Sequence, residues 1–239
     1  MIEQIFDEKA FDEWQLRDIY TVRILALLKS YGCQYQFACF YRQVIDGRIT
    51  AILSRLDHNY TLSVADGFDG EELVHFFCVT GYQSILSSDA FYISPRYEEG
   101  AVMRSSHKNA FTLGNAVVDE YPKLIDLYNF VDYENQEFKA WYVDISHRVR
   151  HKTAKAYTLN VDGAIVSSGI LSSIIDGYSV LTAVRTDSEE RGKGYASVLV
   201  NYICNDVSGE VLLMRDEGLN ESFYTRLGFE NCGKWRMYQ

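Results

Sequence analysis

The chain has 239 residues, of which 47% are hydrophobic and 23% are charged, and its formal net charge is −10. These values are typical of a globular protein with room for one large domain or two small ones, each with its own core. Because a nucleic-acid partner requires a basic face, the acidic balance argues against one.

The first half has the pattern of a helix, three strands and a second helix. Apolar residues at helical spacing predict a long helix over residues 8–30, with Gly32 as its stop. Three strand-like runs follow, at residues 36–45, 48–56 and 60–65. The pair Asp46-Gly47 predicts a two-residue hairpin between the first two runs. A second helix is predicted over residues 69–81.

The second half repeats this order and then continues. An apolar stripe predicts a helix over residues 138–149. Strand-like runs follow at residues 154–161, 164–174 and 178–184, turned by Asp162-Gly163 and Asp176-Gly177. The remaining predicted elements are a glycine-rich turn, a helix ending at Ser208-Gly209, a strand at 211–214, a short helix around 223–227 and a last strand at 234–238.

Helix, three-strand meander, turn and helix therefore occur twice, which indicates an internal structural repeat. After its third strand the first copy has the acidic segment 66–72, whose carboxylates would repel a diphosphate. We expect an N-terminal domain at 1–115, a connecting segment at 116–137 and a domain that carries the site at 138–239. An N-terminal α+β domain unrelated to the second copy is the alternative.

The most informative segment lies between a predicted strand and a predicted helix, and reads Arg191-Gly192-Lys193-Gly194-Tyr195-Ala196. Glycines without a Cβ atom let a ligand approach the main chain closely. The helix start adds unpaired N–H groups and the positive end of the helix dipole, which together suit a diphosphate. It is not the Rossmann motif, which needs a third glycine, and no Gly-Lys-Ser/Thr phosphate loop occurs in the chain.

With their neighbours, these residues resemble the GNAT superfamily of acyl-CoA-dependent N-acyltransferases. The matching elements, in the expected order, are Val184-x-Thr186, Arg191 to Ser197 and Tyr224-x-x-x-Gly228-Phe229. The run Tyr195-Ala196-Ser197 is similar to the glycine N-acyltransferase-like branch, and the resemblance covers about residue 138 to the C-terminus. It implies a mixed α+β fold with a central, mostly antiparallel sheet flanked by helices. With the internal repeat, we expect two tandem halves, of which the N-terminal one is degenerate.

The resemblance also implies roles for particular residues, with acetyl-CoA as co-substrate. The backbone at Val184 and Thr186 would bond the pantetheine arm, and Tyr224 would act as the acid for the leaving sulfur. The pyrophosphate would lie on the turn, whose cofactor-binding residues are Arg191, Gly192, Lys193, Gly194, Tyr195, Ala196 and Ser197. Main-chain binding is favoured there, so the Lys193 side chain is a weaker candidate. Many members carry an asparagine seven residues before the tyrosine; Glu217 stands there, and Asn220 is the nearest substitute.

The sequence does not single out a general base, although the attacking amine must lose its proton. The candidate carboxylates are Asp144, Asp216, Glu217 and Glu221. The basic segment 146–151 falls at a predicted helix C-terminus, where cations complement the dipole, so we interpret it as structural. The five cysteines form no metal-type pair, so we expect reduced thiols and no metal site.

We therefore expect an enzyme that transfers an acetyl group from acetyl-CoA to a primary amine of a small molecule or amino acid. The alternative is a non-catalytic acyl-CoA-binding or regulatory module, and a third possibility is an N-terminal half that mediates homodimerisation. No apolar run reaches membrane-spanning length, and the N-terminus is acidic where a signal peptide is basic. We expect a cytoplasmic protein without a membrane partner.

Overall fold

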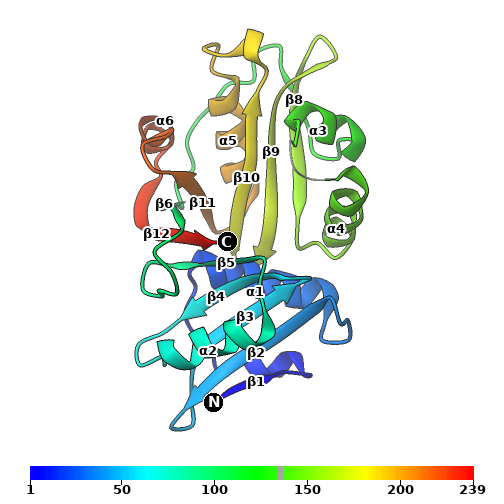
Figure 1. Cartoon of the computed structure of the whole chain (residues 1–239). Helices are drawn as coiled ribbons and strands as arrows, with labels where there is room; N and C mark the ends of the chain where they lie inside the picture. Colours follow the sequence, from blue (N-terminus) through cyan, green and yellow to red (C-terminus); the bar gives the residue numbers. More distant parts are fainter. Residues whose placement is uncertain (134–136) are drawn as a thin grey trace. The chain divides into compact units, whose positions relative to one another are not determined.

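The computed structural model describes residues 1–133 and 137–239, coloured along the chain in Figure 1. Its contacts divide the chain into two compact units. Unit 1 comprises Met1–Val102, Met214–Leu219 and Cys232–Gln239, and unit 2 comprises Met103–Leu213 and Asn220–Asn231. The domain limits expected from the sequence, 1–115, 116–137 and 138–239, stay a prediction. The segment expected to connect the domains contains a strand and a helix, β7 and α3.

Unit 1 is built on a mostly antiparallel sheet. Its elements in chain order are β1 (Ile2–Gln4), η1 (Glu8–Phe11), α1 (Ile19–Tyr31), β2 (Ala38–Ile45), β3 (Arg48–Leu56), β4 (Asn59–Val64), α2 (Gly70–Thr80), β5 (Ser84–Ser88) and the first part of β6 (Glu98–Ser105). The strands lie in the order β1-β2-β3-β4-β5-β12, with β4 and β5 parallel and the other pairs that β1–β5 make antiparallel.

Unit 2 repeats this plan. Its elements are β7 (Val117–Asp119), α3 (Leu124–Val131), α4 (Phe138–Arg150), β8 (Lys155–Val161), β9 (Ala164–Ile175), β10 (Tyr178–Thr186), η2 (Ser188–Glu190), α5 (Tyr195–Asp206), most of β11 (Glu210–Asp216), α6 (Glu221–Arg226) and the start of β12 (Glu230–Tyr238). The strand order is β11-β10-β9-β8-β7, with β10 and β11 parallel and the rest antiparallel.

The two units therefore share one motif. Three antiparallel strands form a meander, a helix follows, and the next strand returns parallel to the third: β2-β3-β4-α2-β5 in unit 1 and β8-β9-β10-α5-β11 in unit 2. This order confirms the expected mixed α+β class and the internal repeat. The predicted hairpins are confirmed as well: Asp162 and Gly163 have φ of 50° and 84°, as a type I′ turn requires.

The long helix expected over residues 8–30 is wrong in its first half. A short 3-10 turn covers Glu8–Phe11, and α1 begins only at Ile19. Asp18 decides this start, because its carboxylate accepts a hydrogen bond from the Thr21 N–H at 2.7 Å and caps the helix. Gly32 ends the helix as predicted, with φ of 64°.

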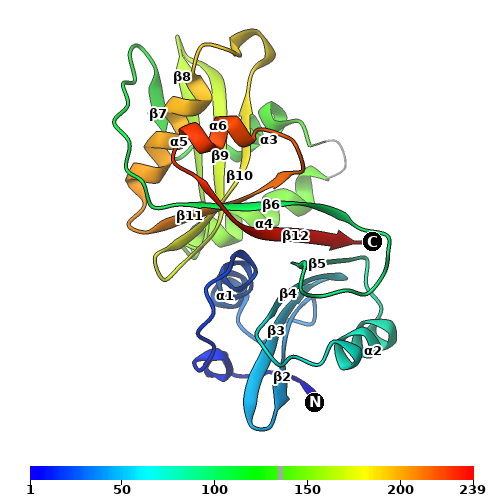
Figure 2. The same cartoon turned by 90° about the vertical axis from the view of Figure 1, so that its left-hand side faces the viewer.

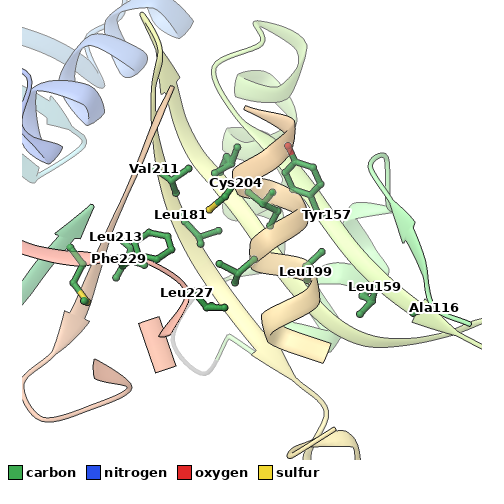
Figure 3. Packing of buried hydrophobic residues seen from close by; sticks show 14 of the residues in the cluster. Ala116, Tyr157, Leu159, Leu181, Leu199, Cys204, Val211, Leu213, Leu227 and Phe229 are labelled. Carbon is green, nitrogen blue, oxygen red and sulfur yellow. The ribbon is translucent and has the colours of Figure 1, made fainter. Parts of the chain in front are cut away.

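In unit 2, helices cover both faces of the sheet. Helix α5 packs against one face, and its Leu199 and Cys204 lie against Leu181 and Val211 in the core of Figure 3. Helices α3 and α4 cover the other face, where Trp141 packs near Ala156. Figure 2 shows α5 in front of these strands and α4 behind them. Among the described residues, no helix is both long and apolar enough to cross a membrane.

Candidate acyl-CoA site

The glycine-rich turn of unit 2 is exposed and ends in an uncapped helix. Arg191 through Gly194 are exposed, and no side chain caps α5 at its N-cap residue, Gly194. The first intrahelical bond runs from the Val198 N–H to the Gly194 carbonyl at 3.1 Å. The N–H groups of residues 195–197 therefore precede the helical ladder, and the first turn of α5 has no acidic residue. An anion is favoured at such a helix start.

Gly192 and Gly194 give the turn its shape. Their φ values are 81° and 87°, in the left-handed region that favours glycine. A Cβ atom added at either position would meet no heavy atom within 4 Å, so the space beside the backbone is open. An open cradle of N–H groups fits the pyrophosphate of an acyl-CoA, and binding of that group by residues 191–197 stays a prediction.

The charged side chains of the turn are already engaged. Lys193 Nζ lies 2.9 Å and 2.8 Å from the two carboxylate oxygens of Glu190, and this contact raises the pKa of Lys193. Arg191 Nε donates to the Thr186 carbonyl at 3.5 Å. These contacts favour main-chain binding at the turn. They agree with the expectation from the sequence that the Lys193 side chain is a weaker candidate.

Strand β10, which leads into the turn, contains a bulge. Thr182 pairs with Ile170 and Arg185 with Ser168, so that two residues of β10, Ala183 and Val184, stand opposite Gly169 alone. Ala183 has φ of 52°, an uncommon conformation for a residue with a side chain. The parallel pairing of β10 with β11 ends before the bulge, at Leu181 and Leu213.

Two buried serines of β9 bond the bulge. Ser168 Oγ donates to the Ala183 carbonyl at 3.0 Å, and Ser167 Oγ donates to the Arg185 carbonyl at 2.9 Å. A left-handed alanine costs about 1–2 kcal/mol, and each such bond contributes about 0.5–1.5 kcal/mol, so the two hydroxyls are of the size needed to offset the strain. Sequence reasoning missed these serines, although an isolated glycine within an apolar strand, here Gly169, indicates a bulge.

The equivalent place in unit 1 is built differently. The ladder between β3 and β4 is regular, without a bulge. The N-terminus of α2 is closed, because the Asp69 carboxylate accepts from the Glu72 N–H at 3.0 Å. Gln43 bonds both the N–H and the carbonyl of Asp69. The first copy thus lacks both the open helix start and the bulged strand.

Tyr224 lies on α6, half-buried beside aromatic rings. Its ring centroid is 4.9 Å from that of Phe223 and 5.6 Å from that of Phe229. Burial raises the pKa of Tyr224 to about 12, so the phenol is neutral at physiological pH. Tyr224, Val184 and Tyr195 all pack against the same core of unit 2. The fold thus brings the predicted acid and the predicted acyl-CoA strand onto one core.

Asn220 has a backbone role. It is the N-cap of α6 in a left-handed conformation, φ 57°, and its carbonyl accepts the Tyr224 N–H at 3.1 Å. Its exposed side chain makes no capping hydrogen bond. Glu217, which stands where many relatives carry asparagine, is exposed. The role of Asn220 in cofactor binding stays a prediction.

The basic segment at the end of α4 is held by contacts along its own helix. Arg148 Nε lies 2.9 Å from Asp144 Oδ1. Asp144, one of the candidate bases, is therefore engaged in an ion pair. Arg150 Nε donates to the Ser146 carbonyl at 3.1 Å, and the ring of His151 lies 4.2 Å from that of His147. These contacts support the structural interpretation of the segment. The candidate base Glu221 accepts a hydrogen bond from Asn231 at 3.2 Å.

Two cavities lie elsewhere in the described residues. One of about 860 Å³ in unit 1 is lined by α2 and by residues 90–92. The other, about 350 Å³ in unit 2, is lined by residues 120–122 and Leu124, by α4 and by the start of β8. Neither lining includes the glycine-rich turn or Tyr224. The candidate site is therefore defined by the backbone geometry of the turn and of β10.

Comparison with known proteins finds likeness in structure only. No family model and no curated protein matches the sequence. A GCN5-related N-acetyltransferase from Kribbella flavida is 14% identical, with a TM-score of 0.60 over 92% of this chain and 93% of that one. A GCN5-related N-acetyltransferase from Sphaerobacter thermophilus is 16% identical, with a TM-score of 0.57 over 97% and 88% of the two chains.

A tandem GNAT protein from the clavulanic acid biosynthesis pathway is similar over the whole length. It is 11% identical, with a TM-score of 0.60 over 99% of this chain and 97% of that one. This likeness agrees with the two-half architecture. The resemblance to the glycine N-acyltransferase-like branch stays a prediction. At identities this low the neighbours establish architecture alone, and that architecture is clear: the chain has the fold of the GNAT acetyltransferases.

Proposed function

We propose that this protein transfers an acetyl group from acetyl-CoA to a primary amine of a small molecule or amino acid. The observation that carries the proposal is the open start of α5, where two positive-φ glycines precede N–H groups outside the helical ladder. The GNAT fold supports acyl transfer as the reaction class. Acetyl-CoA would supply the activated acyl group, as a thioester.

The chain's own groups have three tasks in this proposal. The N–H groups of residues 195–197 bind the pyrophosphate, and the backbone of β10 beyond Leu181 binds the pantetheine arm and polarises the carbonyl. Tyr224 holds a proton for the leaving sulfur. Because the pKa of Tyr224 is about 12 and that of a thiol about 8.5, full proton transfer is uphill, so the phenol assists chiefly by hydrogen bonding.

A substitution in the turn tests cofactor binding. Gly194→Val places a β-branched residue at φ 87° and should weaken acetyl-CoA binding at least about tenfold, measured by calorimetry. Gly163→Val is the matched control, since Gly163 has φ 84° and similar open space in a hairpin away from the turn. Equal affinities in the two folded variants would contradict the proposed site.

A non-catalytic acyl-CoA-binding module is the second candidate. It is favoured by Glu217, which stands in place of the asparagine. It is also favoured by the ion pair between Asp144 and Arg148, because Asp144 is one of the candidate bases. Thiol release from acetyl-CoA, measured with a broad panel of primary amines, separates the two candidates. Steady turnover on any amine excludes the binding module, whereas binding without turnover across the panel supports it.

A further inference from the structure

We propose that Ser168 and Ser167 are positioning residues, which hold the bulge of β10 in the form that receives the acyl-CoA. This inference rests on the proposed function and names residues outside the sequence motifs. Both side chains are fully buried on β9, and each hydroxyl bonds a carbonyl beside the bulge.

The two hydroxyls act from opposite faces of the sheet. Consecutive residues of a strand point to opposite faces, so Ser167 and Ser168 hold β10 from both sides. Ser168 bonds the carbonyl of left-handed Ala183, and Ser167 bonds that of Arg185, with Thr186 Oγ1 a further 3.2 Å neighbour of its hydroxyl. The clamped stretch therefore includes Val184 and ends at Thr186, the two positions predicted to bond the pantetheine arm.

The hydrogen bonds from Ser167 and Ser168, which we call the clamp, hold β10 where regular strand pairing does not. Beyond Leu181, β10 no longer pairs with β11. Its ladder with β9 shifts register between Val180 and Leu181 and is interrupted again at Ala183 and Val184. The serine hydroxyls donate hydrogen bonds to backbone carbonyls at the place where the ladder is irregular. Without them the half-buried carbonyl of Ala183 would lose the Ser168 donor, and the bulge could relax toward regular pairing.

Separating the parts of the cofactor tests this role. Adenosine 3′,5′-bisphosphate reaches only the turn, whereas acetyl-CoA also reaches the bulged strand. In Ser168→Ala we expect the affinity for the bisphosphate to stay within about twofold, while that for acetyl-CoA and the kcat each fall about five- to tenfold. Ser168→Thr, which keeps the hydroxyl, should restore both.

Ser173→Ala is the matched control, because Ser173 is also buried on β9 but pairs with Val180, beside a separate register shift that precedes the bulge. It should lower stability without changing the ratio of the two affinities. A ratio that changes equally in Ser168→Ala and Ser173→Ala would overturn the proposal and leave the serines a structural role.

A ligand-free measurement keeps the clamp separate from the proposed function. Amide hydrogen exchange of residues 183–186 should be faster in Ser168→Ala than in Ser173→Ala, compared at equal global stability. If the wild-type protein does not bind acetyl-CoA, the proposed function fails, and so does a clamp that serves it. If it does bind, equal exchange in the two variants overturns the clamp alone.

Discussion

At the scale of single residues, the chemistry depends on where a few backbone and phenol groups are placed. Tyr224 illustrates this, because burial raises its pKa to about 12 and keeps it protonated throughout the neutral range. A phenol in this state donates a hydrogen bond but does not readily give up its proton. Its contribution should therefore be moderate.

Tyr224→Phe should lower kcat about ten- to a hundredfold and leave acetyl-CoA affinity nearly unchanged. This loss is at or below the rate effect that a general acid usually contributes. Steady-state kinetics and calorimetry on the same preparation measure both. Tyr142→Phe, at an exposed tyrosine of α4, is the control. Because the pKa of Tyr224 is about 12, an alkaline fall of kcat near pH 8–9 that disappears in Tyr224→Phe would contradict the assignment.

At the scale of elements, close contacts between turns fix how the strand and helix of the site meet. Gly209 follows α5 and packs directly on the β9–β10 hairpin. A Cβ atom at Gly209 would lie 1.7 Å from the Gly177 carbonyl oxygen, and the Glu210 N–H donates to that same oxygen at 2.9 Å. The contact is backbone against backbone, so no side chain can move aside to relieve it.

Gly209→Ala should therefore lower the free energy of unfolding by about 2–3 kcal/mol, or prevent folding. Urea titration followed by circular dichroism measures the change. Gly233→Ala is the matched control, because a Cβ atom there meets nothing within 4 Å and the φ of Gly233 is not positive. Similar stabilities for the two variants would show that the backbone at Gly209 can shift after all.

At the scale of the whole molecule, the two units share a motif and differ where the site is built. Unit 2 also contains an ionic network at its edge. Lys155 Nζ lies 2.7 Å from Glu120 and 2.8 Å from Asp206, and the Tyr157 hydroxyl donates to Asp206 at 2.8 Å. Tyr202 bonds the other oxygen of Glu120. The network joins α5 to strand β8 and to the end of β7.

The network predicts a pH dependence of stability. The hydrogen bond from Lys155 lowers the pKa of Glu120. Burial raises the pKa of Asp206, but the hydrogen bonds from Lys155 and Tyr157 outweigh burial, so the pKa of Asp206 is lowered overall. Carboxylates with lowered pKa stabilise the folded state above their unfolded pKa of about 4, and this stability is lost as the pH falls through the folded values.

Lys155→Met should thus lower the free energy of unfolding by about 1–2 kcal/mol at pH 7. The difference in this free energy between variant and wild type should narrow toward pH 3. Thermal or urea unfolding at both pH values measures it. Lys139→Met, at an exposed lysine of α4, should change stability little at either pH. A cost for Lys155→Met that is the same at pH 7 and pH 3 would show that the lysine acts through packing rather than charge.

The sequence by itself determined the local elements and the motif of the site. Hydrophobic periodicity located most strands and helices, the Asp-Gly pairs marked the hairpins, and the glycines between residues 191 and 195 marked the open turn. These features depend on neighbouring residues, so they can be read along the chain. Even here the start of α1 was missed, because one capping carboxylate at Asp18 outweighed the apolar spacing.

Only the tertiary structure decided the features that depend on residues far apart in the chain. The bulge at Ala183 exists because β9 lies beside β10, and its hydroxyl partners stand 15 and 18 positions away. The raised pKa of Tyr224 likewise comes from burial, which no local pattern specifies. Propensity and periodicity describe one segment at a time, whereas strand register and desolvation are properties of segments that meet only when the chain has folded.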